Sequence, residues 1–349
     1  MSAEDPVVAD ATDAVADVGA AASPAESAPE ARRTTGRGAD LAERYALLVA
    51  LVGVIALFSV LPATSDSFAT VTNLKFVLNN QAVPVLVALA VTVPLICNEF
   101  DLSVGAVTAL SSVIAAAGMT RFGLGWGPAI LLAVGVAALI GLVTGLLVAR
   151  GGISSIVVTL AVSSVLIGLL SWYTGGESVL GTFPDPFTSI GTWPWPLVVI
   201  VVVTAALWYL LEQVPWGRRL YAVGSNREAA RLVGIDVATK VTLSLVCSGA
   251  LAGLAGVVAV ARNGGANPTV GPALVLPALA AAYLGATAFR RWFNPLGTVV
   301  GVLLVAFTVS GFTLAGIDPW VKDVINGTLL LLAVALVALL RRRSTATAG

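Results

Sequence analysis

The sequence predicts an all-α polytopic membrane protein with about ten transmembrane helices. Of its 349 residues, 58% are hydrophobic and only 11% are charged, whereas a soluble domain carries roughly 25% charged residues. The apolar residues form continuous runs and do not alternate with polar ones, which excludes a transmembrane β-barrel. The chain also contains 35 glycines, and glycine is commoner in membrane helices than in soluble ones.

Each predicted span is an apolar run that approaches the length needed to cross a bilayer, about 20 residues. The second and eighth runs are short and are interrupted by prolines. Just before the second run, residues 70–81 have the pattern of a short interfacial helix. The ten predicted spans cover 45–63, 82–97, 102–119, 127–149, 155–173, 195–212, 241–261, 273–288, 296–314 and 320–340.

The two ends of the chain are predicted to be tails. Residues 1–44 are rich in Ala, Pro, Ser and acidic residues, so a disordered N-terminal tail is expected, and residues 341–349 form a short C-terminal tail. Lys and Arg concentrate in loops on the cytoplasmic side of a membrane. With the N-terminus inside, 15 of the 19 Lys and Arg residues fall on the inner side. Both tails are therefore predicted to be cytoplasmic, flanking a membrane domain over 45–340.

Two pairs of similar segments indicate an internal repeat. Asp101-Leu-Ser-Val-Gly105 precedes the third span, and Asn267-Pro-Thr-Val-Gly271 precedes the eighth. Residues 141–149 likewise resemble residues 297–306. In the ten-span topology the paired spans run in opposite directions, and repeats of opposite orientation are typical of transporters. Chance similarity between helices rich in Gly, Ala and Val is the alternative.

A polar, basic segment at 213–240 interrupts the apolar runs on the predicted inner side. Ser225 and Glu228 have the spacing of a capping box, and Gly234 lies where a helix C-terminus favours positive φ. We interpret the segment as a short helix on which another protein docks. The alternative is a loop that only anchors the topology, but connections in compact domains are usually about four to six residues long.

The composition argues against an enzyme or a metal site. The chain has no histidine, which is the commonest general base and metal ligand. Its two cysteines, Cys97 and Cys247, fall in or beside apolar runs and match neither a disulfide framework nor a zinc site. No Gly-Lys pair occurs, so the chain holds no P-loop for nucleotide phosphates. We therefore expect no cofactor on this chain, and any ATP-driven step would use a separate subunit.

Five segments carry a family resemblance, and they occur between residues 45 and 340 in the same order as in that family. They are the Asp-Leu-Ser-Val-Gly motif at 101–105, the pair Thr159-Leu160, the Gly/Ala-rich run 248–256, the Pro-Thr-Val-Gly turn at 268–271, and the cytoplasmic loop 217–235, which precedes the Gly/Ala-rich run. Together they resemble the ribose/xylose-type (monosaccharide) permeases of ABC importers, an inner-membrane family that also resembles branched-chain amino-acid permeases.

The resemblance implies the inverted-repeat architecture of the larger ABC importers, with the permease domain over 45–340. It also implies a sugar permease of the bacterial inner membrane, working as a homodimer or heterodimer, of which we expect the homodimer. Its partners would be cytoplasmic ATPase subunits that use the ATP, an extracytoplasmic solute-binding protein and membrane lipid, and no nucleic acid. The residues expected to couple to the ATPase are Arg218, Arg219, Ser225, Asn226, Glu228, Ala229, Ala230 and Gly234.

Polar residues in or beside the spans are candidates for the substrate pathway. Carboxylates at the membrane edge, such as Glu99 and Asp101, are costly to place there, so they are first interpreted as functional residues. Asp101 is also placed to cap the third span, the role that we favour, and Glu99 could simply be solvated. Hydroxyls and glycine pairs within spans usually serve helix packing. The candidates are Asn98, Glu99, Asp101, Ser103, Thr159, Asn267 and Thr269, and the glycine pairs expected at close helix contacts are 141/145, 249/253 and 297/301.

Departures from the family pattern leave the substrate open. Asn98-Glu99-Phe100 stands where Gly-Gly-Ile is usual, and Ala286–Asn294 replaces a turn rich in Gly and Ser. A pentose or hexose is the expected cargo, with a nucleoside, a polyol or an autoinducer-like sugar as alternatives. A secondary transporter of a small polar solute is the rival class, and it would need the carboxylates of Glu99 and Asp101 inside the membrane.

Overall fold

The computed structural model of the protein describes residues 37–286 and 293–318, together with the isolated positions 320, 321, 324, 327, 328 and 331. The chain divides into two units, residues 1–40 and 41–349. Of the first unit, only the opening turn of helix α1 (Arg37–Val60) is described. The predicted tails before residue 37 and at 341–349, and most of the predicted tenth span at 320–340, lie outside the described residues.

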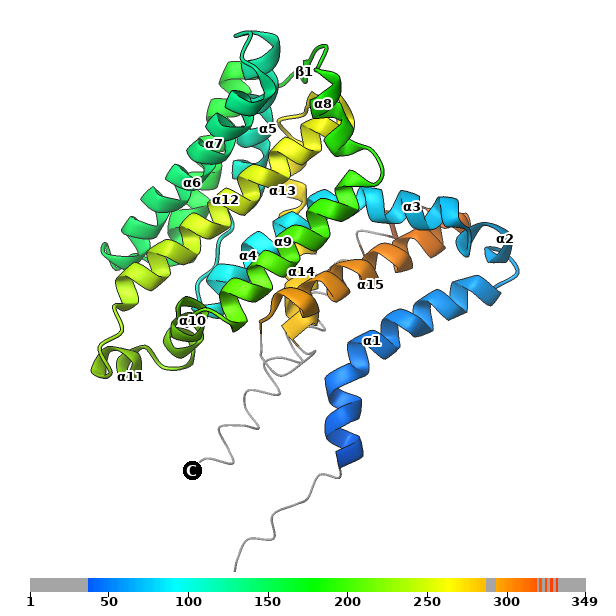
Figure 1. Ribbon diagram of the computed structural model, residues 1–349, viewed down its shortest axis with the longest axis horizontal. Helices are drawn as coiled ribbons and strands as arrows, with labels where there is room; N and C mark the ends of the chain where they lie inside the picture. The colour runs from blue at the N-terminus through cyan, green and yellow to red at the C-terminus, as the bar shows by residue number, and fades with distance from the viewer. Residues whose placement is uncertain are drawn as a thin grey trace, which may run out of the picture. The chain divides into compact units, whose positions relative to one another are not determined.

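Most of the described residues are helical, which confirms the all-α class (Figure 1). Among them, five helices are long and apolar enough to cross a membrane, or six if the bent pair α3–α4 counts as one span. The helices that match predicted spans are α1, α4 (Ala82–Ile96), α5 (Val104–Thr120), α6 (Trp126–Ala149), α7 (Ser155–Thr174), α9 (Trp195–Glu212), α12 (Val237–Asn263), α14 (Val275–Ala286) and α15 (Pro295–Leu314).

Short elements join these helices. The helix predicted over 70–81 is present as α3 (Val71–Asn80), which meets α4 at a bend of 43°. The hydroxyl of Thr70 caps it by accepting from the backbone N–H of Asn73 at 3.1 Å. The other connecting elements are α2 (Ser65–Phe68), β1 (Val179–Leu180), α8 (Asp185–Thr188), the 3-10 helix η1 (Ser189–Gly191), α10 (Pro215–Ser225), α11 (Arg227–Leu232), β2 (Gly265–Ala266) and α13 (Val270–Ala273).

The core forms where α4, α5, α6 and α12 pack together. Every residue of α4 except Pro84 is buried, as expected for a helix that is apolar on all sides. Helix α6 lies against α12 with backbones in close contact, because a Cβ added at Gly141 would overlap the backbone of Leu245. The glycines at 145, 249, 253, 297 and 301 meet a neighbouring helix in the same way, so the predicted close contacts are confirmed.

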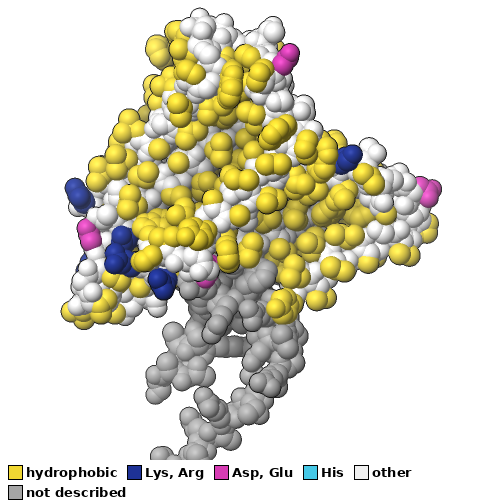
Figure 2. Space-filling model, in the orientation of Figure 1, with side chains coloured by type: hydrophobic (Ala, Val, Ile, Leu, Met, Phe, Trp, Pro, Cys, Tyr) yellow, Lys and Arg dark blue, Asp and Glu magenta, His cyan; other side chains and the backbone are white. Residues whose placement is uncertain are grey.

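Connections between the helices gather at two opposite ends of the bundle (Figure 1). One end, here called the α10–α11 end, holds these two helices and the turns before α5, α7 and α15. At the other end β1 and β2 form a two-stranded antiparallel sheet that pairs Val179 with Ala266, close to α8. Figure 2 shows most of the Lys and Arg side chains on the visible face near α10 and α11, where Arg218, Arg219 and Arg231 are exposed, and one more on the far side of that face near α3.

Candidate functional site

The polar segment predicted to dock a partner forms two helices rather than one. Helix α10 begins at Pro215, a residue well suited to a first helical turn, and ends at Ser225. Asn226 then caps α11, its Oδ1 accepting from the backbone N–H groups of Glu228 and Ala229 at 3.0 Å each. The predicted capping box of Ser225 and Glu228 is therefore wrong by one position, because α10 extends through Ser225 and the Asn226 amide serves as the cap.

The predicted end of the segment at Gly234 is confirmed. Gly234 has φ +80°, the left-handed conformation that favours glycine. Its N–H donates to the carbonyl of Arg231 at 2.9 Å, and the N–H of Ile235 donates to the carbonyl of Ala230 at 3.0 Å. This pair of hydrogen bonds is the Schellman motif. Helix α11 is therefore capped at both ends by residues of the same segment.

One face of α10 holds the segment against the rest of the protein. Leu220 and Val223 are fully buried. Gly224 approaches the end of α4 so closely that an added Cβ would overlap the carbonyl of Ile96. The hydroxyl of Tyr221 donates to the carbonyl of Phe293, just before α15, at 2.7 Å. Helix α10 is therefore attached to two neighbouring parts of the bundle.

The opposite face is exposed and forms a candidate docking surface. Seven of the eight residues predicted to couple are exposed or nearly so, but Ala230 is 3% exposed and faces inward. Sequence reasoning missed Leu232 and Val233, which are 88% and 76% exposed. An apolar pair directly before the helix-ending glycine was the available signal. The docking face consists of Arg218, Arg219, Glu228, Ala229, Arg231, Leu232 and Val233.

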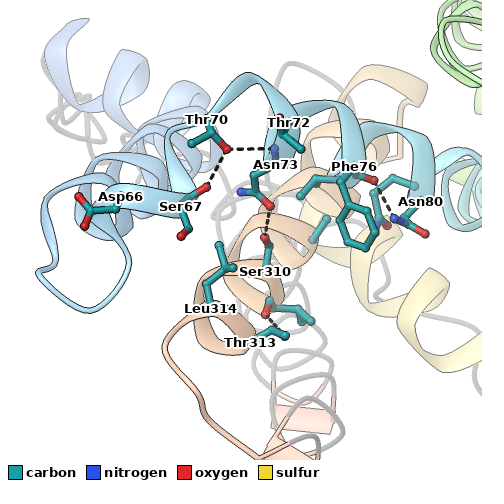
Figure 3. A pocket seen from close by; sticks show the side chains of 14 residues that line it. Asp66, Ser67, Thr70, Thr72, Asn73, Phe76, Asn80, Ser310, Thr313 and Leu314 are labelled. Atoms are coloured by element: carbon teal, nitrogen blue, oxygen red, sulfur yellow. Dashed lines mark hydrogen bonds between the residues drawn. The ribbon is translucent and has the colours of Figure 1, made fainter.

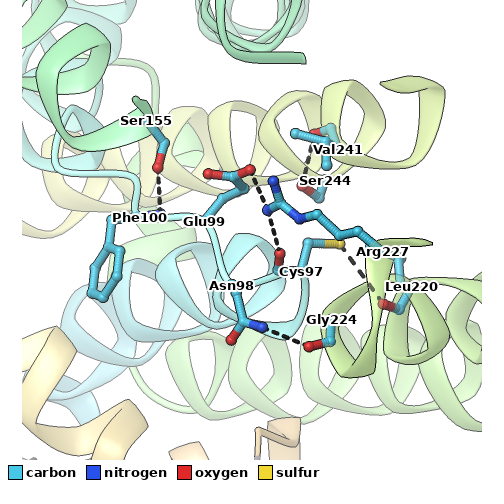
Figure 4. A network of polar contacts seen from close by, with 10 residues as sticks. All are labelled: Cys97, Asn98, Glu99, Phe100, Ser155, Leu220, Gly224, Arg227, Val241 and Ser244. Carbon is cyan, nitrogen blue, oxygen red and sulfur yellow. Dashed lines mark hydrogen bonds and ion pairs between the residues drawn. The ribbon is translucent and has the colours of Figure 1, made fainter. Parts of the chain in front are cut away.

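The turn between α4 and α5, residues 97–103, lies directly against α11 (Figure 4). Arg227 Nη2 donates to Glu99 Oε1 at 2.5 Å and to the carbonyl of Cys97 at 2.9 Å. Asn98, in the left-handed region at φ +57°, donates from Nδ2 to the carbonyl of Gly224 at 2.5 Å. Glu99 is therefore not solvated, since it is 6% exposed and paired with a helix of the docking segment.

The Glu99–Arg227 pair is asymmetric in its exposure. The side chain of Glu99 is 8% exposed, whereas that of Arg227 is 41% exposed. Removing the partner of a buried charge costs about 3–5 kcal/mol at fully buried sites, and solvent around Arg227 reduces that penalty here. Beside the pair lies a cleft of about 530 Å³, also bordered by Arg231 and Ser155.

Asp101 is buried in the same turn and does not cap α5, so that prediction is wrong. Its Oδ1 accepts from the backbone N–H of Ser103 at 3.0 Å and from the Ser103 hydroxyl at 2.5 Å, and its Oδ2 accepts from Ser248 of α12 at 2.7 Å. The residue at the cap position is Ser103. Asp101 is 3% exposed, and its carboxylate ties the start of α5 to α12.

The seven predicted pathway residues do not form one site. Five of them, Asn98, Glu99, Asp101, Ser103 and Thr159, lie in or beside the turn between α4 and α5. Thr159 is fully buried and donates to the carbonyl of Ser155 at 2.7 Å. The other two lie in the turn before α13, where Asn267 Oδ1 accepts from the N–H and the hydroxyl of Thr269 at 2.9 and 2.8 Å.

A cleft of about 580 Å³, lined by both polar and apolar side chains, lies between α2–α3 and α15, at the end of the bundle opposite α10–α11 (Figure 3). Asn73 spans it, accepting from the Ser310 hydroxyl at 3.1 Å and donating to the carbonyl of Phe68 at 2.9 Å. Asp66, Phe76 and Gln81 also line it. None of these residues was predicted as a site. Within the described part of the chain, no group of Cys, Asp and Glu side chains could hold a metal ion.

Comparison with known proteins gives a consistent assignment. Residues 73–334 match the family described as branched-chain amino acid transport system / permease component. The ribose import permease protein RbsC of Escherichia coli (strain K12) is 32% identical over 294 residues, covering 81% of this chain and 91% of the relative. RbsC of Bacillus subtilis (strain 168) is 33% identical, covering 82% and 90%. The fructose import permease protein FrcC of Rhizobium meliloti is 31% identical, covering 83% of each. No solved structure gives a significant match.

Proposed function

The chain belongs to the family of branched-chain amino acid transport system permease components, and we propose that it is the membrane-spanning subunit of an ATP-binding cassette importer that carries a sugar across the bacterial inner membrane. Relatives named for ribose, fructose, D-allose and galactose import support a pentose or hexose as the cargo. The chain acts as a transport subunit and not as an enzyme.

The observation that carries this proposal is the docking face on α10–α11. An exposed apolar pair, Leu232 and Val233, at the end of a capped helix has no internal partner to pack against. The basic residues Arg218, Arg219 and Arg231 surround it with positive charge. The sequence itself lacks a P-loop, so ATP hydrolysis falls to a separate subunit. A cytoplasmic ATPase is the partner that this face would receive, which puts the α10–α11 end in the cytoplasm.

The ten-span topology with an inverted repeat is part of the proposal. Successive connections of the described chain alternate between the two ends, as ten spans with both termini in the cytoplasm require. The two predicted repeat motifs also share one turn geometry, because Asp101 accepts from both donors of Ser103 and Asn267 accepts from both donors of Thr269. The two turns lead into helices that meet where Gly105 lies against Gly271, as expected for repeats related by a pseudo-two-fold axis in the membrane plane.

The remaining partners follow from the same assignment. A solute-binding protein would deliver the sugar at the end opposite α10–α11. The cleft between α3 and α15 lies at that end, and its amides, carboxylate and the Phe76 ring suit a ligand rich in hydroxyls. A second copy of this chain would complete the pathway as a homodimer in the lipid bilayer.

Reconstitution tests the proposal. The chain is to be purified with the ATPase and binding protein encoded beside it and placed in proteoliposomes. Uptake of radiolabelled D-ribose, D-fructose, D-allose and D-galactose is then measured with and without ATP inside. We expect ATP-dependent uptake of at least one sugar. Uptake that survives ATP depletion while an ion gradient is intact would instead establish a secondary transporter, and uptake of only a nucleoside or polyol would overturn the sugar.

A further inference from the structure

We propose that the Glu99–Arg227 ion pair is the connection through which movement of the docking face reaches the transmembrane helices. The inference rests on the proposed function, because it assigns the route by which an ATPase seated on α10–α11 would act on the bundle. It gives Glu99 and Arg227 the role of positioning residues. Neither is expected to touch the sugar or the ATP.

The contacts of α11 determine which parts of the protein would move when a force acts on this helix. At its N-terminal end, Arg227 is the first residue of α11 and reaches two groups of the α4–α5 turn, Glu99 and the carbonyl of Cys97. Asn98 donates a further hydrogen bond to the carbonyl of Gly224, the last but one residue of α10. Both links end on three consecutive residues, 97–99, so the end of α10 and the start of α11 are fastened to one short turn.

That turn in turn contacts three transmembrane helices. The N–H of Phe100 donates to the Ser155 hydroxyl at the start of α7 at 3.1 Å. Asp101 accepts from Ser248 of α12 at 2.7 Å. The turn continues directly into α5, where Gly105 lies against the backbone of Gly271. A displacement of residues 97–99 would therefore shift the contacts of α5, α7 and α12 together.

The surroundings of the pair allow such a displacement. The cleft of about 530 Å³ beside Glu99 and Arg227 leaves one side of the pair unpacked. An ion pair also resists separation more than a neutral hydrogen bond does, because the buried Glu99 carboxylate would be left without a counter-charge. The pair can therefore pull the turn along with α11 while α11 keeps room to move.

The partner class is an ATPase that bears on the docking face, and Glu99 does not contact it, since its side chain is 8% exposed.

The test compares transport with ATP hydrolysis in the complete complex. Glu99→Gln keeps the size of the side chain and removes its charge, and Glu99→Asp keeps the charge. Arg150→Gln is the matched control, because it removes one exposed charge at the same end without touching residues 97–103. For each variant, ATPase copurification, ATP hydrolysis and uptake of radiolabelled D-ribose, or of whichever of the four sugars the unaltered complex imports, are measured.

We expect the Glu99→Gln complex to retain the bound ATPase subunit and the basal rate of ATP hydrolysis. The amount of sugar imported per ATP should fall about tenfold, which is within the usual range of coupling between sites. Glu99→Asp is expected to recover part of the ratio, as is the exchange Glu99→Arg with Arg227→Glu. If Glu99→Gln left the amount of sugar imported per ATP unchanged, the proposal would be overturned. It would also be overturned if Glu99→Gln no longer bound the ATPase, because the ion pair would then serve only to hold the docking face in shape. Failure of the unaltered complex to import any sugar with ATP would instead count against the proposed function.

Discussion

Gly105 at the start of α5 and Gly271 in α13 lie backbone against backbone. A Cβ added at Gly105 would lie 2.5 Å from the carbonyl oxygen of Gly271, and a Cβ on Gly271 would overlap the carbonyl of Gly105. The two glycines end the two similar motifs that begin at Asp101 and Asn267. The contact therefore joins equivalent positions of the proposed repeat.

Gly105→Ala or Gly271→Ala should destabilise the protein by about 1–3 kcal/mol, the usual cost of forcing extra atoms into a packed core. The measurement is the thermal unfolding midpoint of the purified permease in detergent. Gly135→Ala in α6 is the control, because no atom lies within 4 Å of its added Cβ. Equal midpoints for Gly135→Ala and Gly105→Ala would contradict the close contact.

Leu232→Ser should reduce ATPase binding about tenfold, because it removes the most exposed apolar side chain of the docking face. Copurification of the ATPase at several salt concentrations measures the effect. Leu180→Ser is the matched control, since Leu180 is 70% exposed at the opposite end of the bundle. Equal loss of the ATPase in both variants would point to a general effect on the membrane protein and against this docking face.

Glu228→Lys and Gly234→Asp should abolish coupling while folding and membrane insertion remain intact. Glu228 stands exposed in the first turn of α11, where a negative charge complements the helix dipole. Gly234 has φ +80°, so any other residue strains the end of the helix. ATPase binding and sugar uptake are the measurements. Unchanged values in both variants would remove α11 from the coupling mechanism.

Asn226→Ala should loosen α11 by about 1 kcal/mol, the typical cost of losing a helix cap. Hydrogen exchange of the backbone amides of Glu228 and Ala229 should therefore become faster. Ser225→Ala is the control and should leave these amides unchanged, since Ser225 is the last residue of α10. The opposite result would restore the capping box that the sequence spacing suggests.

Asp66→Asn should lower sugar uptake severalfold without affecting ATPase binding, if the cleft between α3 and α15 receives the solute. A carboxylate is a strong acceptor for sugar hydroxyls, and Asp66 lines the cleft. Asp185→Asn is the control, because Asp185 is an exposed acid at the same end but outside the cleft. Uptake at the same rate in both variants would exclude Asp66 from the solute path.

Much of the fold could be predicted because a long apolar helix is recognisable from the composition of its own segment. Helix α6 was expected at 127–149 and spans Trp126–Ala149, and Gly234 was expected at positive φ and has it. The cap of α11 was misplaced by one residue, because Ser225 and Asn226 are both good caps and only the extent of α10 selects between them. Asp101 failed as a cap for a similar reason, since α5 begins at Val104 and Ser103 therefore occupies the cap position.

The sequence by itself determined the membrane class, the positions of most helices, the family resemblance and the position of the polar segment 213–240, because these depend on local composition and short motifs. Only the tertiary structure placed Glu99 against Arg227 and Gly105 against Gly271. Such pairings join residues more than a hundred positions apart. They depend on how whole helices pack, and no local pattern in the chain encodes that packing.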